Sequence, residues 1–238
     1  MAKPVMKTAC GMALLGLAAT VAPATAAQLH VRPVGIQLTA PAKASKLVLT
    51  NRGRTPISAQ VRIFRWTQRN GRDVLSRTRD VVASPPLLKM RPGRENIVRI
   101  VRLSRAPVRG EESYRLLVDE IPRKKTHGSG VTFALRYSIP VFFTAPDATP
   151  AKVSWSAGVR GGRLWLRARN SGQRHDKISK LRVVLNGRSH TISAGLAGYV
   201  LGGAAHAWQT PLRVRKGASI IIKGQGINGP FSATVRVR

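Results

Sequence analysis

Adjacent polar residues at three places in this chain have the types that acid–base chemistry requires. His175-Asp176 could be a general base with its orienting carboxylate, but the sequence places no activated serine or cysteine to complete a nucleophilic set. We expect a capped turn at this position instead. In so basic a chain, the carboxylate pairs Glu111-Glu112 and Asp119-Glu120 are expected to form local ion pairs rather than an acid and base couple.

The remaining candidates for metal or phosphate binding are weak. The glycine-rich segments 158–163 and 223–229 do not follow a strand into a helix, as a phosphate cradle would. The mature chain is expected to lack cysteine, and its histidines show no ligand spacing. We therefore predict no catalytic set, no cofactor and no metal site. The dispersed histidines are His30, His127, His175, His190 and His206.

The overall charge is strongly positive, with 41 Lys and Arg against 9 Asp and Glu, a formal net charge of +32. Such a balance attracts polyanions, including nucleic acid, anionic lipid and acidic polysaccharide. Export and the lack of an aromatic-studded RNA-binding strand argue against nucleic acid as the partner. We expect the tryptophans to be core or interface residues with satisfied indole N–H groups. They are Trp66, Trp155, Trp165 and Trp208.

Residues 1–26 have the order of a secretory signal peptide. Lys3 and Lys7 precede an apolar run over 9–21, and Ala24 and Ala26 suit a signal peptidase that cleaves after Ala26. The apolar run is too short for a membrane span, so we expect an exported chain that is not embedded in a membrane. Without cysteine, the mature protein must be stabilised by burial and backbone pairing.

The segment 130–143, GVTFALRYSIPVFF, carries apolar side chains at every second position, which is the period of a β-strand. A core strand of a sandwich would show the same alternation. The segment follows a basic, glycine-containing loop and runs into what looks like an interdomain linker, which favours a strand that serves a partner. The alternating residues are Val131, Phe133, Leu135, Tyr137, Ile139 and Val141.

The rest of the chain also predicts β-structure. Asn70-Gly71 suits a type I′ hairpin, and Pro33 confines the first strand, within 29–38, to an edge or a kink. Apolar residues on both sides of 96–103 predict a central strand, and the glycine-rich segment 195–211 is expected to be loop with one short strand. We predict an all-β protein of two immunoglobulin-like β-sandwich domains, 27–146 and 147–238, after a cleaved signal peptide.

Several linked motifs together resemble the periplasmic chaperones of fimbria and pilus assembly, and look closest to the non-classical, Csu-like branch. The resemblance covers almost the whole mature chain. It implies a two-domain periplasmic protein, not an enzyme, that binds an incomplete fimbrial or pilus subunit and delivers it to an outer-membrane usher. The motifs, in order, are NRGRTPISAQVRIFRWTQRNGRDVL, SPPLLKMRPG, VRIVR, YRLLVDEIP, FALRYSIPVF, NSGQRHDKISKL and GLAGYVLGGAAHAW.

The resemblance also implies a mechanism, donor-strand complementation. The chaperone lends its G strand, here Val131 to Val141, to a subunit that lacks the last strand of its own sandwich. The missing strand leaves an apolar groove in the subunit, and the residues that fill it must be every second residue of the lent strand. A slip by one residue would turn all of them away from the groove. The expected donor residues are Val131, Phe133, Leu135, Tyr137 and Ile139.

The sequence departs from the family at one important place. Well-studied members anchor the subunit's C-terminal carboxylate with an Arg on the first strand and a Lys on the G strand, and the matching positions here hold Gly35 and Pro140. A guanidinium is the natural partner of a carboxylate, so another arginine must supply the charge if the carboxylate is anchored. The candidates, in order, are Arg136 and Arg115, then Arg99 and Arg102.

Two other interpretations remain open at this point. An exported sandwich protein could adhere to anionic envelope polysaccharide through its arginines, and this binding would weaken steeply with ionic strength. A structural surface subunit could have the same fold, but it would lack a final strand and carry an N-terminal donor extension.

Overall fold

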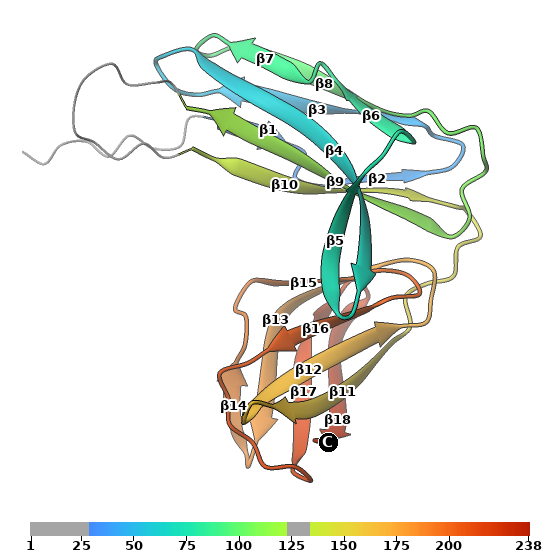
Figure 1. Cartoon of the computed structure of the whole chain (residues 1–238), viewed down its shortest axis with the longest axis vertical. Coiled ribbons are helices and arrows are strands. Elements are labelled where there is room, and N and C mark those ends of the chain that lie inside the picture. The colour runs from blue at the N-terminus through green and yellow to red at the C-terminus, as the bar shows by residue number, and fades with distance from the viewer. Residues whose placement is uncertain (1–28, 123–133) are drawn as a thin grey trace, which may run out of the picture.

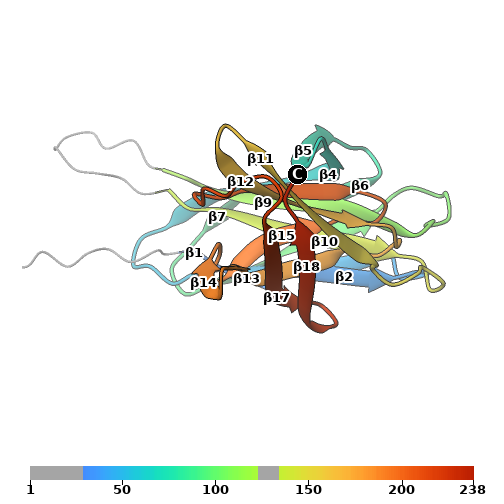
Figure 2. The same ribbon diagram turned by 90° about the horizontal axis from the view of Figure 1, so that it is seen from below.

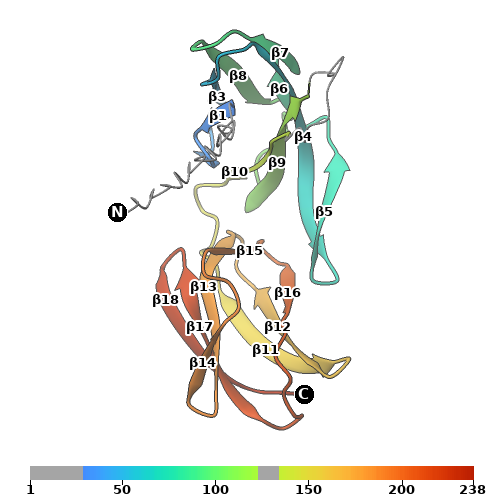
Figure 3. The same ribbon diagram turned by 90° about the vertical axis from the view of Figure 1, so that its left-hand side faces the viewer.

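The computed structural model describes residues 29–122 and 134–238, and within them the chain forms β-strands joined by turns and loops. Strands from residues 29–144 build two sheets, and strands from residues 153–236 build two more. The expected all-β class is thus confirmed. The proposed boundary between 146 and 147 lies in the segment joining the two sandwiches, which Figure 3 shows one above the other. The expected signal peptide, 1–26, lies outside the described residues.

The N-terminal sandwich consists of two sheets of different size (Figure 1). One has the order β1-β3-β8-β6 and the other β2-β10-β9-β4-β5, with β7 also paired to β4. The smaller sheet contains β1 (Leu29–Arg32), β3 (Ala44–Asn51), β8 (Glu95–Arg102) and β6 (Val81–Ser84). The larger contains β2 (Ile36–Thr39), β10 (Arg136–Thr144), β9 (Glu111–Ile121), β4 (Ile57–Arg69), β5 (Arg72–Arg77) and β7 (Leu87–Met90).

Alternation along the strands builds the core between these sheets, as expected. Leu47 and Leu49 of β3 are completely buried, and Val98 and Ile100 of the neighbouring strand β8 are buried in the same core. β8 is an internal strand, as predicted from its sequence. Its outer face is more open than we expected, because Ile97 is 53% exposed.

The first β segment is divided between the two sheets. β1 lies at the edge of the smaller sheet, and β2 lies at the edge of the larger one, with Pro33 between them. The edge position was predicted, but the single first strand expected within 29–38 is in fact two strands. Since proline has no N–H to donate to a ladder, the chain can leave one sheet there and join the other.

The hairpin between β4 and β5 has the predicted type I′ geometry. Asn70 and Gly71 both have positive φ, 52° and 76°. The hairpin extends from the N-terminal sandwich to the second one, where the Ala207 N–H donates to the Gly71 carbonyl over 2.9 Å (Figures 1 and 3). A Cβ at position 71 would lie 2.8 Å from the Cβ of Ala207, so the close approach itself requires glycine.

The C-terminal sandwich also has two sheets, and Figure 2 shows its strands β17 and β18 side by side. The segment 195–211 forms two strands instead of the one predicted, and they belong to opposite sheets. The three-stranded sheet is β11 (Val153–Arg160), β12 (Arg163–Asn170) and β16 (Ala205–Gln209). The other is β14 (Arg188–Thr191), β13 (Asp176–Leu185), β17 (Ser219–Gly226) and β18 (Gly229–Arg236), with β15 (Leu196–Val200) paired to β13.

A buried asparagine plays the same part in both sandwiches. The amide of Asn51 donates to the carbonyls of Thr55 and Met90, and its oxygen accepts the Gly53 N–H. Asn170 does the same with the carbonyls of residues 174 and 200 and the N–H of residue 172. Each side chain satisfies backbone groups of a turn and of a distant strand, so it holds the end of its sandwich together.

Candidate functional site

The two ends of β10 differ in how many strands they pair with. β10 pairs antiparallel with β9 over its whole length, Arg136 to Thr144. It pairs parallel with β2 only from Val141 to Thr144. Within the part of the chain that the structure describes, the edge of residues 136–140 that faces away from β9 therefore has no neighbouring strand.

The register shows which backbone groups lie along this open edge. Glu120 donates its N–H to the Leu135 carbonyl over 2.9 Å, so odd-numbered residues of β10 turn their polar groups toward β9. Even-numbered residues turn theirs the other way. The open edge thus presents the N–H and C=O groups of Arg136 and Ser138. Unpaired groups in such a row are a template for another strand.

The described donor-strand residues lean toward the protein's own core. Leu135 and Tyr137 are half-buried against it, and the Tyr137 hydroxyl donates to the Leu29 carbonyl over 2.6 Å. Ile139 is only 2% exposed and belongs to that core outright. Val131 and Phe133, the first two predicted donor residues, lie outside the described residues.

A second cluster lies where the two sandwiches meet. Trp66 and Phe142 of the N-terminal sandwich pack with Tyr199 and Leu201 of the C-terminal one. The imidazole of His175 stacks on the Phe142 ring, with centroids 3.6 Å apart. This cluster joins the face of β10 that carries Phe142 to the second sandwich.

Polar contacts tie the same junction together. Gln68 donates to the Tyr199 carbonyl over 2.8 Å and accepts the Leu201 N–H over 3.0 Å. His175 is buried beside Glu111, whose Oε1 lies 2.8 Å from both the backbone N and Nδ1 of the histidine. The capped turn expected at His175-Asp176 is wrong, because Asp176 begins β13 and pairs with Val200 while His175 belongs to the junction.

Comparison with known proteins identifies the family. Residues 28–150 match the family model described as "Pili and flagellar-assembly chaperone, PapD N-terminal domain". The chain belongs to this chaperone family. No curated protein matches the sequence. The family membership agrees with the expected resemblance and favours a chaperone over a structural surface subunit.

Solved structures agree with this assignment. A chain of the CsuC–CsuE chaperone–tip adhesion subunit pre-assembly complex of Acinetobacter baumannii is 25% identical, with a TM-score of 0.69, covering 89% of this chain and all (100%) of that one. The Pseudomonas aeruginosa CupB2 chaperone is 16% identical, with a TM-score of 0.56 and coverage of 88% and 100%. A chain of the Salmonella enterica SafA pilin–SafB chaperone complex is 16% identical, with a TM-score of 0.60, and the match covers 86% of this chain and 95% of that one. The first match bears out the Csu-like resemblance, and the other two show the fold.

In this chaperone, Gly35 and Pro140, which occupy the positions of the family's usual anchor pair, lie beside each other. A Cβ on Gly35 would lie 3.7 Å from the Pro140 side chain. The residue opposite Pro140 on β9 is Arg115. Its guanidinium lies over the Trp66 ring, 3.6 Å from the centroid, and 5.0 Å from that of Tyr199. Burial lowers the pKa of Arg115, which stays cationic at neutral pH.

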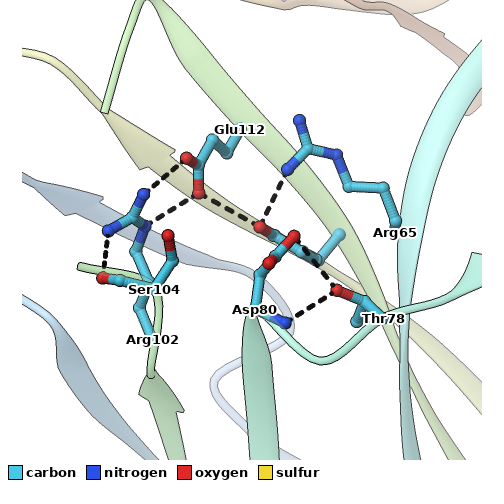
Figure 4. Close-up of polar contacts among 7 residues, drawn as sticks. Arg65, Thr78, Asp80, Arg102, Ser104 and Glu112 are labelled. Atoms are coloured by element: carbon cyan, nitrogen blue, oxygen red, sulfur yellow. Dashed lines mark hydrogen bonds and ion pairs between the residues drawn. The ribbon is translucent and has the colours of Figure 1, made fainter. Parts of the chain in front are cut away.

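The other candidate arginines of the chaperone are in different surroundings. Arg136 is exposed and forms an ion pair with Asp119, and Arg99 is exposed on β8. Arg102 is buried, and its guanidinium donates to both oxygens of Glu112 and to the Ser104 carbonyl (Figure 4). Of the four candidates, Arg115 alone is at the junction of the sandwiches, beside the positions of the missing anchor pair.

Two of the four carboxylates expected to form ion pairs do so with arginines, whereas Glu111 contacts His175 and Glu120 forms no ion pair within the described residues. Glu112 pairs with Arg102, and Asp119 pairs with Arg62 and Arg136. Burial alone would raise the pKa of Glu112, but hydrogen bonds from Arg102 and the Tyr114 hydroxyl lower it. Burial also raises the pKa of Tyr114 to about 12.

Two further expectations concern the chaperone's tryptophans and metal binding. Among the described residues, the buried indole N–H of Trp66 has no hydrogen-bond partner, against expectation, whereas that of Trp208 donates to the Ala197 carbonyl over 2.8 Å. Across residues 29–122 and 134–238, no group of three potential metal ligands occurs. No helix long and apolar enough to cross a membrane is found in these same ranges.

Proposed function

We propose that this chain is a periplasmic chaperone that captures fimbrial or pilus subunits by donor-strand complementation and delivers them to an outer-membrane usher. The observation that carries the proposal is the open edge of β10 at 136–140, in a chain of the pilus assembly chaperone family. An extended segment of a partner can pair with this edge through main-chain hydrogen bonds.

The energetic reason for such a partner is general. A subunit that lacks one strand exposes an apolar groove and unpaired backbone groups, and each buried polar group without a partner costs about 1–3 kcal/mol. Donated backbone groups satisfy that edge, and alternating apolar side chains fill the groove. In this proposal Val131, Phe133 and Leu135 enter the groove, Tyr137 lies at its end, and Ile139 anchors the lent strand in the chaperone's own core.

Arg115 is the first choice as the anchor of the subunit's carboxylate. Three features support it: its place opposite Pro140, its partial burial, and the absence of a carboxylate paired with it among the described residues. Arg136 and Arg102 already hold Asp119 and Glu112, and Arg99 lies on the other sheet. We thus place Arg115 ahead of Arg136, the reverse of the order that the sequence alone suggested.

The capture step can be tested with a matched pair of variants. The tagged mature protein is purified from the periplasm of its host in high salt, and co-purifying proteins are identified. We expect a small β-rich subunit with the wild type and with Ala134→Glu, and none with Leu135→Glu. Both changes add one negative charge to neighbouring residues, but only Leu135 lies on the apolar face that we propose enters the groove, whereas Ala134 is exposed on the opposite face. Equal recovery with both variants would contradict the proposal, as would retention of anionic polysaccharide alone.

The anchor can be tested separately. Arg115→Ala should lower the yield of the subunit complex about tenfold or more, because a charge-assisted hydrogen bond to the carboxylate is lost. Arg136→Ala and Arg99→Ala should each change the yield less than threefold, about the effect of an exposed ion pair. An unchanged yield for Arg115→Ala would remove it as the anchor while leaving strand donation intact.

A further inference from the structure

A cavity of about 330 Å³ opens where the β4–β5 hairpin meets the outer face of the sheet β11-β12-β16. Both sandwiches build it, since Asn70, Gly71 and Arg72 come from the hairpin and the other lining residues come from the C-terminal sandwich. The hydrogen bond between Gly71 and Ala207 closes one wall. Its volume is at the small end of the range for small-molecule sites, about 300–1,000 Å³.

The cavity is positively charged. Arg72, Arg160 and Arg167 all line it, and no carboxylate is among its lining residues. None of the three forms an ion pair within the described parts of the chain. The nearby carboxylate of Asp73 accepts a hydrogen bond from Gln68 at the junction instead. Three guanidinium groups from two sandwiches repel one another, and a bound anion would relieve that repulsion.

The cavity also offers a flat aromatic surface. The indole of Trp165 lies across Gly158 on the neighbouring strand, where a Cβ would be 2.8 Å from its Nε1. One ring face therefore packs on the backbone of β11, and the ring still lines the cavity. The amides of Asn70 and Gln209 are further lining groups that can both donate and accept hydrogen bonds.

We propose that this cavity binds an acidic saccharide, a sugar ring that carries a carboxylate or phosphate group. The C–H groups of a sugar ring pack on an indole face, its hydroxyls suit amide groups, and its acidic group suits a guanidinium fork. An inorganic anion or an acidic peptide would use the arginines and leave the indole face without a role. The site contains none of the residues of the open β10 edge, so it is a binding function separate from subunit capture.

The test is titration calorimetry of the mature chain at low ionic strength, where exposed charges are least screened. The probes are trigalacturonate and mannose 6-phosphate, which distinguish a carboxylated from a phosphorylated source. Trigalacturonate methyl ester has the same rings without the charge and serves as the control ligand. We expect at least one acidic probe to bind at least tenfold more tightly than the ester. Equal binding of the ester, or no binding of either acidic probe, would overturn the proposal.

Two sets of variants locate the binding. The double change Arg160→Gln with Arg167→Gln should weaken binding of the acidic sugar about tenfold or more. Arg182→Gln with Arg188→Gln removes the same charge from exposed positions of the other sheet and should change it less than twofold. Equal losses in both pairs would mean general attraction to a basic protein and no site. Subunit recovery in high salt should be the same for both pairs.

The aromatic contribution separates a sugar from an acidic peptide. Trp165→Leu should weaken binding of the acidic sugar several-fold and leave the weaker binding of inorganic phosphate unchanged. Trp165→Phe should have a sugar affinity between those of the wild type and Trp165→Leu. Thermal denaturation checks that each variant is folded, and if Trp165→Leu is not, the Trp165→Phe comparison decides. If poly-L-glutamate binds as tightly as the sugar and neither change at Trp165 alters sugar binding, the ligand is an acidic peptide and the proposal fails.

Discussion

The two ends of β10 share one sequence pattern and lie in different surroundings. At Val141 and Phe143 the strand pairs on both sides, and these side chains are fully buried. From Arg136 to Pro140 the strand pairs on one side only. Leu135 and Tyr137, which flank the first residue of β10, are half-buried. Alternation thus supplies an apolar face at both ends. The number of paired edges decides which end can still accept a partner.

Pro140 lies at the transition between these two ends. The backbone nitrogen of Pro140, which carries no hydrogen, lies on the side away from β9, because even-numbered residues turn their polar groups in that direction. The β9 ladder therefore loses nothing, and β2 begins to pair one residue later, at Val141. A proline at this register can end the pairing with β2 without weakening the rest of the sheet.

The largest effect should come from the doubly paired end. Phe143→Ala removes a fully buried ring that meets the Tyr114 ring edge to face, with centroids 5.9 Å apart. We expect the free energy of unfolding of the N-terminal sandwich to fall by about 3–5 kcal/mol, as for other buried aromatic truncations. Chemical denaturation measures this. Leu135→Ala is the control and should cost less than about half as much, since its site is half open. Similar losses would show that the two ends are equally packed.

Proline substitutions at neighbouring residues test the register of the open edge. Tyr137→Pro removes a donor to β9 and a hydroxyl bonded to the Leu29 carbonyl, so it should destabilise the sandwich by about 2–3 kcal/mol. Ser138→Pro removes a donor that faces the open edge. It should leave the unfolding free energy within about 0.5 kcal/mol and weaken subunit binding about tenfold. Denaturation and competition binding measure the two effects. If Ser138→Pro proves the more destabilising, the assigned directions of the backbone groups are wrong.

The smallest effect concerns acid sensitivity, because a carboxylate of β9 lies opposite each end of β10. Glu112 is opposite Phe143, and Asp119 is opposite Arg136. For Asp119, burial alone would raise the pKa, but hydrogen bonds from Arg136 and Arg62 lower it, so both carboxylates have lowered pKa values. A lowered folded-state pKa adds stability above the unfolded-state pKa, and this stability is lost as the pH falls through the folded-state value.

The two carboxylates should contribute unequally to that loss. The Arg102 side chain that pairs with Glu112 is 3% exposed, whereas the Arg136 side chain that pairs with Asp119 is 64% exposed and screened by solvent. Glu112→Gln should therefore flatten the fall in unfolding free energy on acidification more than Asp119→Asn does. Denaturation curves recorded from neutral to acidic pH give both slopes. A steeper dependence on Asp119 would place the stronger ion pair at the open end.

The structure also shows where reading the sequence succeeded and where it failed. Short-range rules predicted the type I′ hairpin at Asn70-Gly71 and the apolar alternation that buries Ile139 and Val141, because neighbouring residues alone specify a turn and a strand face. The two strands in 195–211 were missed in part, because small residues there give little alternation and their partners, β13 and β12, lie far away in sequence.

Side-chain partners were harder to foresee than strands. His175 was interpreted as part of a turn, yet it stacks on Phe142, and Arg102 was a candidate anchor, yet it holds Glu112 inside its own sandwich. In a chain with 41 basic side chains, sequence cannot single out the arginine that meets an aromatic ring and the one that meets a carboxylate. Only the packing of separate strands brings those partners within reach.

The all-β class, the apolar face of residues 131–141 and the chaperone resemblance all follow from the amino-acid sequence, since alternation, turn residues and ordered motifs are local properties of the chain. Three features follow only from the arrangement of the strands in space: β10 is paired on one side at 136–140, Arg115 lies over Trp66 at the junction, and three arginines line one cavity. The physical reason is that open edges and charge clusters depend on which distant strands become neighbours.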